Sequence, residues 1–370
     1  MSDSEPELAP IALPQKKAPS PRKKEEEPEL APIPVAASAA SAASAAAAPP
    51  PQPARPAAGE TDGKLRGRRT ALPPDLIPGY VLEEWLGEGT MGAVYRAKQV
   101  SLERTVAVKV LTPHLAKNER YLKRFQREAR AVAKLNHPNV VSGIDVGESQ
   151  GCRYFVMEYV EGPTLLQLLE KTGRLDAMSA THIIHQIARA LDHAHRTGLV
   201  HRDVKPANII VTSKGNVAKL CDLGLAKEVS EGGADTGEGR AMGTPFYISP
   251  EQARGEADID IRSDIYSLGA TYYHAVCGRP PFTGPTPAVI MAKHLTEDIV
   301  PVRTVVSQVP VGVAGVIERA LRRSRADRYQ SPEEMIKELD QVLDGTWKPP
   351  HHTYLSSPSA RRRARIRRHR

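Results

Sequence analysis

The stretch "HRDVKPAN", residues 201–208, lies between the apolar runs "LV" and "IIV". Four of its side chains are charged or titratable, namely those of His201, Arg202, Asp203 and Lys205. Burying such groups costs free energy unless they pair, bind a metal or take part in chemistry. The stretch therefore predicts a functional loop inside a folded domain, and its charges need partners from elsewhere in the chain.

Both ends of the 370-residue chain differ in composition from its middle. Residues 1–75 are rich in Pro, Ala, Ser, Glu and Lys with almost no aromatic side chains, so they cannot bury enough apolar surface to fold and are predicted to be disordered. Residues 346–370 contain seven arginines, which account for nearly all of the formal net charge of +8. This basic, disordered tail either is exposed to solvent without a specific role or binds an anionic partner, such as nucleic acid or lipid.

The sequence shows no sign of export or membrane insertion. The opening "MSDSEPELAP" is acidic and Pro-rich, unlike a signal peptide, and no run of about 18 strongly apolar residues occurs. Cys152, Cys221 and Cys277 lack the spacing of a metal site and fit free thiols in a reducing compartment. We therefore expect a cytoplasmic protein with no transmembrane segment.

Strand and helix patterns divide the middle of the chain into two parts. From residue 80 the pattern alternates, and "TVAVKVL", "VVSGIDVGE" and "CRYFVMEYV" read as further strands around an amphipathic helix at 119–136. After Gly162 the helical period dominates. Helices are predicted at 176–197, 264–277, 286–295, 311–321 and 331–343, with a hairpin strand in "KGNVAKLCDLG".

These patterns predict a single α+β domain of two lobes over 76–345. The small lobe, at about 76–160, is a mostly antiparallel sheet with one main helix. The larger lobe, at about 163–345, is mostly α-helical.

Three glycines, Gly87, Gly89 and Gly92, lie in "GEGTMGAV" between two predicted strands. A turn without Cβ atoms can bring backbone N–H groups close to phosphate oxygens, although such glycines are also common in ordinary hairpins. The turn leads into the strand "AVYRAK" rather than a helix, which disfavours a dinucleotide-binding fingerprint, and no Gly-Lys-Ser/Thr follows, which excludes a Walker loop.

Several polar residues outside this turn are candidates for binding phosphate and metal. Lys109 stands among valines in "VAVKV", where it either pairs with an anion or extends its amine to water. Glu128 on the following helix is either its partner or an exposed acid. Of Asp203, Asn208 and Asp222, one Asp and the Asn can supply the hard oxygen ligands that Mg²⁺ prefers, and the second Asp can orient a hydroxyl and take its proton.

Five motifs occur in a fixed order, "GEGTMGAV", "VAVK", "HRDVKPAN", "DLG" and "SPE". Together they resemble the signature of the eukaryotic-type (Hanks-type) protein kinases, in particular the bacterial Ser/Thr kinases. The resemblance covers roughly residues 80–343. It implies a signalling enzyme that transfers the γ-phosphoryl group of ATP to Ser/Thr hydroxyls of proteins, with Mg²⁺ or Mn²⁺ as cofactor and with autophosphorylation.

The resemblance also implies a role for each motif residue. Asp203 corresponds to the catalytic base, with Lys205 beside the γ-phosphate, while Lys109, braced by Glu128, holds the α- and β-phosphates. Asn208 and Asp222 correspond to the metal ligands. The implied nucleotide site comprises Leu86, Gly87, Glu88, Gly89, Gly92, Val94, Ala107, Lys109, Glu128, Met157 as gatekeeper, the backbones of Glu158 and Val160, and Ile210.

Other carried-over residues are structural or regulatory. Glu251 and Arg328 resemble a buried ion pair of the family, and Asp264 resembles the acid that anchors the catalytic loop. Arg202 implies control by phosphorylation of the segment after "DLG", where Thr236 and then Ser230 are the expected sites, although a plain flexible loop is the alternative. Lys205 and the peptide-docking pattern "GTPFYISPE" favour Ser/Thr over Tyr acceptors. Two departures, Leu223 for Phe and Ser249 for Ala, leave Asp222 and Glu251 in place.

Two alternatives remain open on the sequence. A pseudokinase or scaffold would bind partners through its tails, although such a protein would be free to lose one of the five residues Lys109, Glu128, Asp203, Asn208 and Asp222. The arginine tail could also make nucleic-acid or membrane binding the main activity, in which case deletion of 361–370 would abolish salt-dependent binding.

We expect Thr236→Ala to lower phosphotransfer activity, because a phosphate at this position would pair with Arg202 and order the surrounding segment. Peptide mapping by mass spectrometry and initial-rate kinetics check this together. Unchanged kinetics and no phosphopeptide containing Thr236 would remove the assignment.

Overall fold

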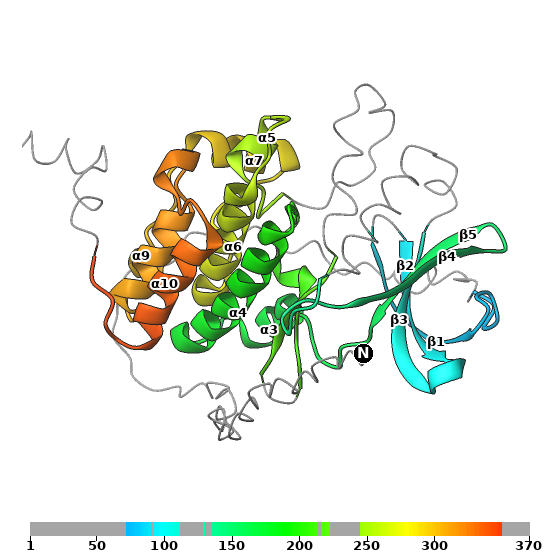
Figure 1. The fold of residues 1–370 in the computed structure, drawn as a ribbon. Helices are drawn as coiled ribbons and strands as arrows, with labels where there is room; N and C mark the ends of the chain where they lie inside the picture. Colours follow the sequence, from blue (N-terminus) through cyan, green and yellow to red (C-terminus); the bar gives the residue numbers. More distant parts are fainter. Residues whose placement is uncertain are drawn as a thin grey trace, which may run out of the picture. The chain divides into compact units, whose positions relative to one another are not determined.

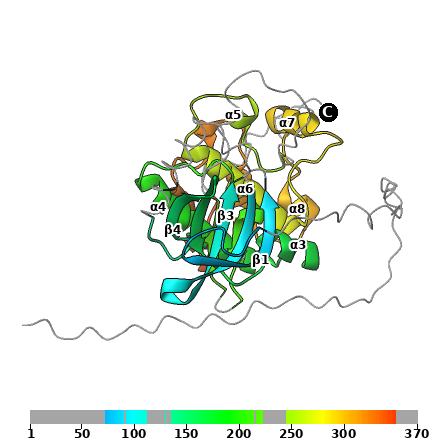
Figure 2. The ribbon, with the colours of Figure 1, turned by 90° about the vertical axis from the view of Figure 1, so that its right-hand side faces the viewer.

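The computed structural model describes residues 72–89, 92–111, 129, 135–213, 216–222 and 245–349. They form a five-stranded antiparallel sheet and a group of helices that lie on opposite sides in Figure 1. In Figure 2, turned by 90°, the strands face the viewer and helices lie behind and above them. The predicted α+β fold, with a sheet-based small lobe and a helical large lobe, is confirmed.

The sheet of the small lobe has the order β1-β2-β3-β5-β4. Its strands are β1 (Tyr80–Gly89), β2 (Gly92–Gln99), β3 (Arg104–Leu111), β4 (Gly143–Ser149) and β5 (Cys152–Glu158). The central strand, β3, reads "RTVAVKVL", and its last six residues are buried. A run of β-branched residues without alternation suits a strand covered on both faces. Lys109 is therefore held in the best-packed strand of the lobe.

The large lobe is built on two buried helices, α4 (Ala177–Arg196) and α6 (Ile261–Cys277). Around them lie α3 (Leu165–Thr172), α5 (Pro250–Ala253), α7 (Pro287–Thr296), α8 (Val302–Val305), α9 (Val311–Ala320), α10 (Pro332–Leu343) and the hairpin of β6 (Ile209–Val211) with β7 (Ala218–Leu220). The helix predicted at 176–197 is confirmed as α4, and Ile183, Ile184, Ile187 and Leu191 on one of its faces are fully buried.

Capping side chains decide where these helices begin. Helix α6 starts three residues before the predicted position 264, because the Asp260 carboxylate accepts a hydrogen bond from the N–H of Arg262. Helix α3, which the sequence analysis did not predict, starts with a capping box of Thr164 and Gln167. The predicted helix at 119–136 lies almost entirely outside the described residues, but Ala129 is helical and buried.

The two lobes meet where the segment before β4 runs beside β7. The N–H of Val141 donates to the carbonyl oxygen of Leu220 at 2.9 Å, and the N–H of Leu220 donates to that of Asn139 at 2.8 Å. The side-chain amide of Asn139 also donates to the carbonyl oxygen of Ala218 at 2.9 Å. Backbone pairing therefore fixes β7, the strand that leads to Asp222, against the small lobe.

Packing extends beyond the regular elements at both ends of the domain. Leu76 and Ile77 are 4% and 1% exposed and belong to the core on one face of the sheet, and the N–H of Leu82 donates to the carbonyl oxygen of Pro74. At the other end, Trp347 packs beside Gly312 and its indole donates to Glu338. We infer that the folded domain includes both segments.

Replacing Leu76 by Ala is expected to lower the free energy of unfolding by about 2–5 kcal/mol, because a buried leucine leaves a cavity when it is truncated. Urea denaturation measures the change. The control is Val81→Ala, since Val81 is 43% exposed and its truncation should change stability by less than about 0.5 kcal/mol. Equal stabilities of the two variants would show that the segment before β1 does not belong to the fold.

Candidate active site

Lys109 and Asp222, which are 113 positions apart in sequence, form an ion pair with 2.8 Å between Nζ and Oδ1. The Lys109 side chain is 5% exposed, whereas that of Asp222 is 40% exposed. In the register of the sheet, Lys109 lies between Val94 of β2 and Phe155 of β5. The structure thus brings together the two charges that the sequence analysis placed around one triphosphate.

The loop 201–208 folds its polar side chains around Asp203. Lys205 Nζ donates to Asp203 Oδ2 at 2.7 Å, and Asn208 Nδ2 donates to both the carbonyl oxygen and Oδ2 of Asp203, at 2.8 and 3.1 Å. A short 3₁₀ turn, Pro206–Asn208, returns Asn208 toward Asp203. Because the amide nitrogen of Asn208 is used in these bonds, its amide oxygen is the atom that can bind a cation.

Cys221 connects this loop to Asp222. Its N–H donates to the carbonyl oxygen of Asn208 at 2.9 Å, and its own carbonyl oxygen lies 3.1 Å from Nε2 of His201. Asp203, Asn208 and Asp222 therefore form one cluster of oxygen-bearing side chains. Burial raises the pKa of the Cys221 thiol well above its usual range, so the thiol stays protonated and is a poor nucleophile.

Asp222 of this cluster and Arg202 next to Asp203 have a left-handed backbone, with φ 56° and φ 64° respectively. For a residue with a Cβ this conformation costs on the order of 1–3 kcal/mol, so surrounding bonds must maintain it. The buried carboxylate of Asp264 supplies two such bonds, because it accepts the N–H groups of His201 and Arg202, each at 2.7 Å. Asp264, in the first turn of α6, thus holds the loop as expected.

The glycine-rich turn is the connection between β1 and β2. At Gly92, which has φ 155°, a Cβ atom would lie only 1.9 Å from the carbonyl oxygen of Val110 on β3. Only glycine therefore allows β2 to pair with β3 at this point. Gly89 lies opposite Gly92, Leu86 and Glu88 are exposed, and residues 90–91 at the tip lie outside the described range.

The predicted adenine-binding residues lie on adjacent elements. Met157 is buried opposite Ala107, Val94 is partly buried on β2, and Ile210 of β6 forms a bridge with Thr164. Val160, two positions beyond the end of β5, also packs partly against the core. This placement suits the expected apolar contacts with a base.

Glu158 differs from the simple expectation of a backbone contact. Its N–H already donates to the carbonyl oxygen of Ser142 at 2.9 Å, which leaves the carbonyl as its backbone group for a base. Its carboxylate pairs with Lys219 of β7 at 2.9 Å. The sequence analysis missed this ion pair, because the alternation of β7 predicts only that Lys219 points away from the core.

Some predicted residues cannot be placed. Glu128, Ser230, Thr236 and Leu223 lie outside the described residues. Within the described part of the chain, no three His, Cys, Asp or Glu side chains gather as a metal site of their own. The pair of Asn208 and Asp222 fits a cation whose remaining ligands are phosphate oxygens and water, as is usual for Mg²⁺. None of the helices in the described ranges is both long and apolar enough to cross a bilayer.

Comparison with known proteins decides the family. Residues 80–349 match the family model described as "Protein kinase domain". This chain belongs to the protein kinase family. It is 39% identical over 298 residues to a probable Ser/Thr-protein kinase of Clostridium perfringens, CPE1738, and 41% identical over 278 residues to the Ser/Thr-protein kinase PknB of Mycolicibacterium smegmatis. These alignments cover 80% and 74% of this chain but only 41% and 44% of the relatives, so it spans less than half of their length.

A solved kinase has the same fold. The crystal structure of the PknI kinase domain of Mycobacterium tuberculosis is 31% identical and superposes with a TM-score of 0.58, covering 72% of this chain and 96% of that one. Protein kinases use ATP and a divalent metal, which agrees with the cluster of Lys109, Asp203, Asn208 and Asp222.

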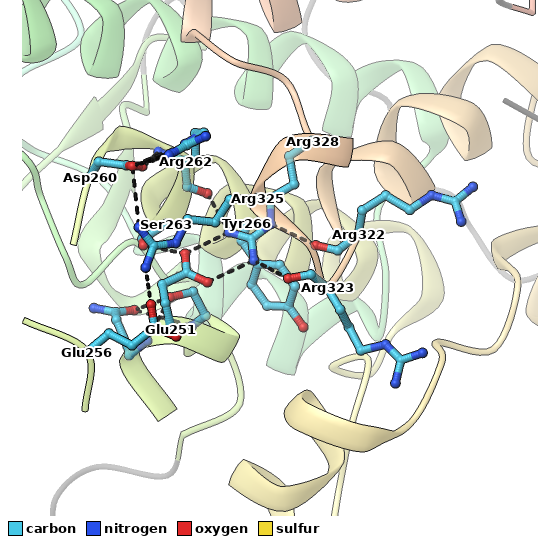
Figure 3. Close-up of polar contacts among 12 residues, drawn as sticks. Glu251, Glu256, Asp260, Arg262, Ser263, Tyr266, Arg322, Arg323, Arg325 and Arg328 are labelled. Carbon is cyan, nitrogen blue, oxygen red and sulfur yellow. Dashed lines mark hydrogen bonds and ion pairs between the residues drawn. The ribbon is translucent and has the colours of Figure 1, made fainter. Parts of the chain in front are cut away.

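The large lobe contains a fully buried ion pair between Glu251 and Arg328, drawn in Figure 3. The guanidinium reaches the two carboxylate oxygens at 2.7 and 2.8 Å, and Ser263 donates to the same carboxylate. Arg328 also donates to the carbonyl oxygens of Arg262, Arg322 and Arg323. Burial acts to raise the pKa of Glu251, but the hydrogen bonds and charge of Arg328 hold that pKa below its usual range.

Truncation of Arg328 to Ala is expected to lower the free energy of unfolding by about 3–5 kcal/mol, because it leaves the carboxylate of Glu251 buried without its cation. Thermal or urea unfolding measures the loss. Arg323→Ala is the matched control from the same loop, since its pair with Asp298 is exposed and should contribute at most about 1 kcal/mol. A loss at Arg328 no larger than that at Arg323 would contradict the assignment.

Proposed function

We propose that this protein is an ATP-dependent protein serine/threonine kinase. The observation that carries the proposal is the 2.8 Å pair of Lys109 with Asp222 beside the loop of Asp203 and Asn208. In this arrangement one lysine and three oxygen-bearing side chains face a common region, as phosphoryl transfer requires. The names of the relatives, which are Ser/Thr-protein kinases, support the class of acceptor.

In the proposed enzyme, different charged and polar residues would bind the phosphates and the cation of the nucleotide. Lys109 would bind the α- and β-phosphates, while Asn208 and Asp222 would hold Mg²⁺, or Mn²⁺ in its place, because both cations prefer oxygen ligands. Glu128 would brace Lys109. When bound, the cation would neutralise phosphate charge and interact with Asp222. Lys109 would then be able to pair with phosphate oxygens and not only with Asp222.

Asp203 would act on the acceptor. Its carboxylate is fixed by Lys205 and Asn208, so it can orient a Ser or Thr hydroxyl and accept its proton as the bond to phosphorus forms. Lys205, 2.7 Å from Asp203, is positioned to offset negative charge on the transferred group. Positioning and electrostatic stabilisation would supply most of the rate enhancement.

The acceptor protein would bind along residues 245–251, which we call the docking segment. Its sequence, "PFYISPE", continues into α5, where the side-chain amide of Gln252 donates to the carbonyl oxygen of Arg202 at 2.9 Å. This bond joins α5, which continues the docking segment, to the loop that carries Asp203. Lys205 favours Ser/Thr acceptors, and phosphorylation at Thr236 or Ser230 would order the preceding segment through Arg202.

The proposal also covers the basic tail and the location of the protein. The arginines within 361–370 would bind an anionic partner, nucleic acid or lipid, because their positive charge attracts phosphate groups. A cytoplasmic location would supply ATP and keep the free thiols of Cys152, Cys221 and Cys277 reduced.

We expect Asp203→Asn to abolish phosphotransfer while ATP binding remains within about threefold of wild type, because the residue acts on the acceptor and not on the nucleotide. Incubation with labelled ATP and Mg²⁺ measures transfer, and equilibrium binding of a fluorescent ATP analogue measures affinity. Asp258→Asn, at a side chain that is 93% exposed, is the control and should retain full activity.

Two outcomes would contradict the proposal in different ways. Equal incorporation of label by wild type and Asp203→Asn would refute the role of Asp203. Binding of ATP with no transfer by the wild type to any protein would instead favour a pseudokinase scaffold.

A further inference from the structure

Two histidines of the large lobe, His274 of α6 and His294 of α7, have no part in the proposed phosphate site, yet both lie beside the docking segment or its support. His274 contacts the segment directly. Its Nδ1 lies 2.7 Å from the hydroxyl of Tyr247, and the two rings stack at 6.1 Å with an angle of 15°. Burial lowers the pKa of His274 and raises that of Tyr247, so a neutral imidazole and a protonated phenol share this hydrogen bond.

His294 is fully buried beneath the same region. Its Nδ1 lies 2.8 Å from the hydroxyl of Tyr266, and the Phe282 ring packs edge-on against it at 4.8 Å. Burial lowers the pKa of His294 to about 4, so the imidazole is neutral, and it raises the pKa of Tyr266, so the phenol keeps its proton. A neutral imidazole carries one proton, and the backbone carbonyl oxygens of Pro245 and Phe246 beside the ring favour its place on Nε2, with the Tyr266 hydroxyl donating to Nδ1.

That Nε2 atom is buried, and no described residue accepts its proton in good hydrogen-bond geometry. The backbone carbonyl oxygens of Pro245 and Phe246 are nevertheless close enough to act as its acceptors, and they raise the pKa of His294 against the effect of burial. The donor is therefore aimed at the backbone of the docking segment without a well-formed bond to it, and a small shift of the segment would complete one.

The other contacts of the docking segment are fixed. Glu251 at its end is held by Arg328, and the guanidinium of Arg328 also lies 4.8 Å from the centre of the Tyr266 ring. Figure 3 labels all three residues. Tyr266 thus contacts both the ion pair at the end of the segment and His294 near its start. Among the described residues, the contact of His294 with the start of the segment is the one that is not fully formed.

We propose that His274 and His294 are positioning residues for the acceptor protein. His274 fixes the ring of Tyr247, and His294 keeps its Nε2–H for a carbonyl oxygen of Pro245 or Phe246 when the docking segment holds a Ser/Thr peptide. This inference rests on the proposed kinase function and deepens it by naming the groups that set peptide recognition. It requires that affinity for the peptide, but not for ATP, depends on the two histidines.

Two substitutions of His294 separate its nitrogen atoms. His294→Asn keeps a polar group near the position of Nδ1 but removes the donor at Nε2, whereas His294→Gln places an amide near Nε2. We expect Asn to raise the apparent KM for peptide by about tenfold, the effect of one hydrogen bond, and Gln to stay within about threefold of wild type. The measurement uses the full chain, Mg²⁺-ATP and a library of peptides with a central Ser or Thr.

The contact of His274 is tested by a double-mutant cycle with Tyr247. His274→Leu and Tyr247→Phe should each raise the apparent peptide KM by about three- to tenfold, and the double variant should be no worse than the more affected single one. The KM for ATP should stay within about twofold in every variant. His185→Gln on α4, which removes a histidine paired with Asp340, is the control and should leave both KM values unchanged.

Each other outcome is decisive. Peptide KM values unchanged by His294→Asn and His274→Leu, or a parallel rise in the KM for peptide and for ATP with a lower melting temperature, would show that the histidines only support the fold. These results would overturn the present inference and leave the proposed kinase function intact. A wild-type chain that binds ATP but phosphorylates no peptide in the library would overturn the proposed function instead.

Discussion

Two hydrogen bonds from the loop 201–208 to the carboxylate of Asp264 are the constraint on which the arrangement of the candidate active site depends. They hold Arg202 in a left-handed conformation that its own side chain disfavours. Asp264 is itself fixed, because α6 is buried along almost all of its length. A charged group inside a packed helix thus acts as a rigid support for a loop that must present other charges to a ligand.

The same helix supports the rest of the large lobe's functional surface. Ser263 binds Glu251, Tyr266 contacts Arg328 and His294, and His274 binds Tyr247. One rigid element therefore determines the relative positions of the loop 201–208 and residues 245–251. This explains why polar residues are kept inside a helix that packing alone would make apolar.

The contact between the lobes follows a different principle. Backbone pairing of residues 139–141 with β7 and the ion pair of Glu158 with Lys219 fix the strand that leads to Asp222 against the small lobe. The pair of Lys109 and Asp222 then joins the lobes at the site itself. In the proposed enzyme, the phosphate and the cation would take over both charges without exposing the lysine to water, because Lys109 is buried and Asp222 is half-exposed.

The sequence alone determined whatever is encoded locally. The period of apolar residues predicted α4, and the order of the five motifs along the chain predicted a kinase-like site. Both kinds of pattern can be recognised without knowledge of the fold, because they depend only on residue types and their spacing in sequence. The residues of the site were named from these motifs, and the structure places Lys109, Asp203, Asn208 and Asp222 together. Helix ends were less accurate, since a cap such as Asp260 resembles any other surface acid until its partner N–H is known.

Only the tertiary structure decided which distant groups meet. Lys219 and Glu158, Gln252 and the carbonyl of Arg202, and the histidines beside Tyr247 and Tyr266 carry no mark of their partners in sequence. Each contact joins segments whose separation along the chain is unrelated to any helical or strand period. It exists because packing of whole elements brings the groups within hydrogen-bonding distance, and that packing is a property of the complete fold rather than of any one segment.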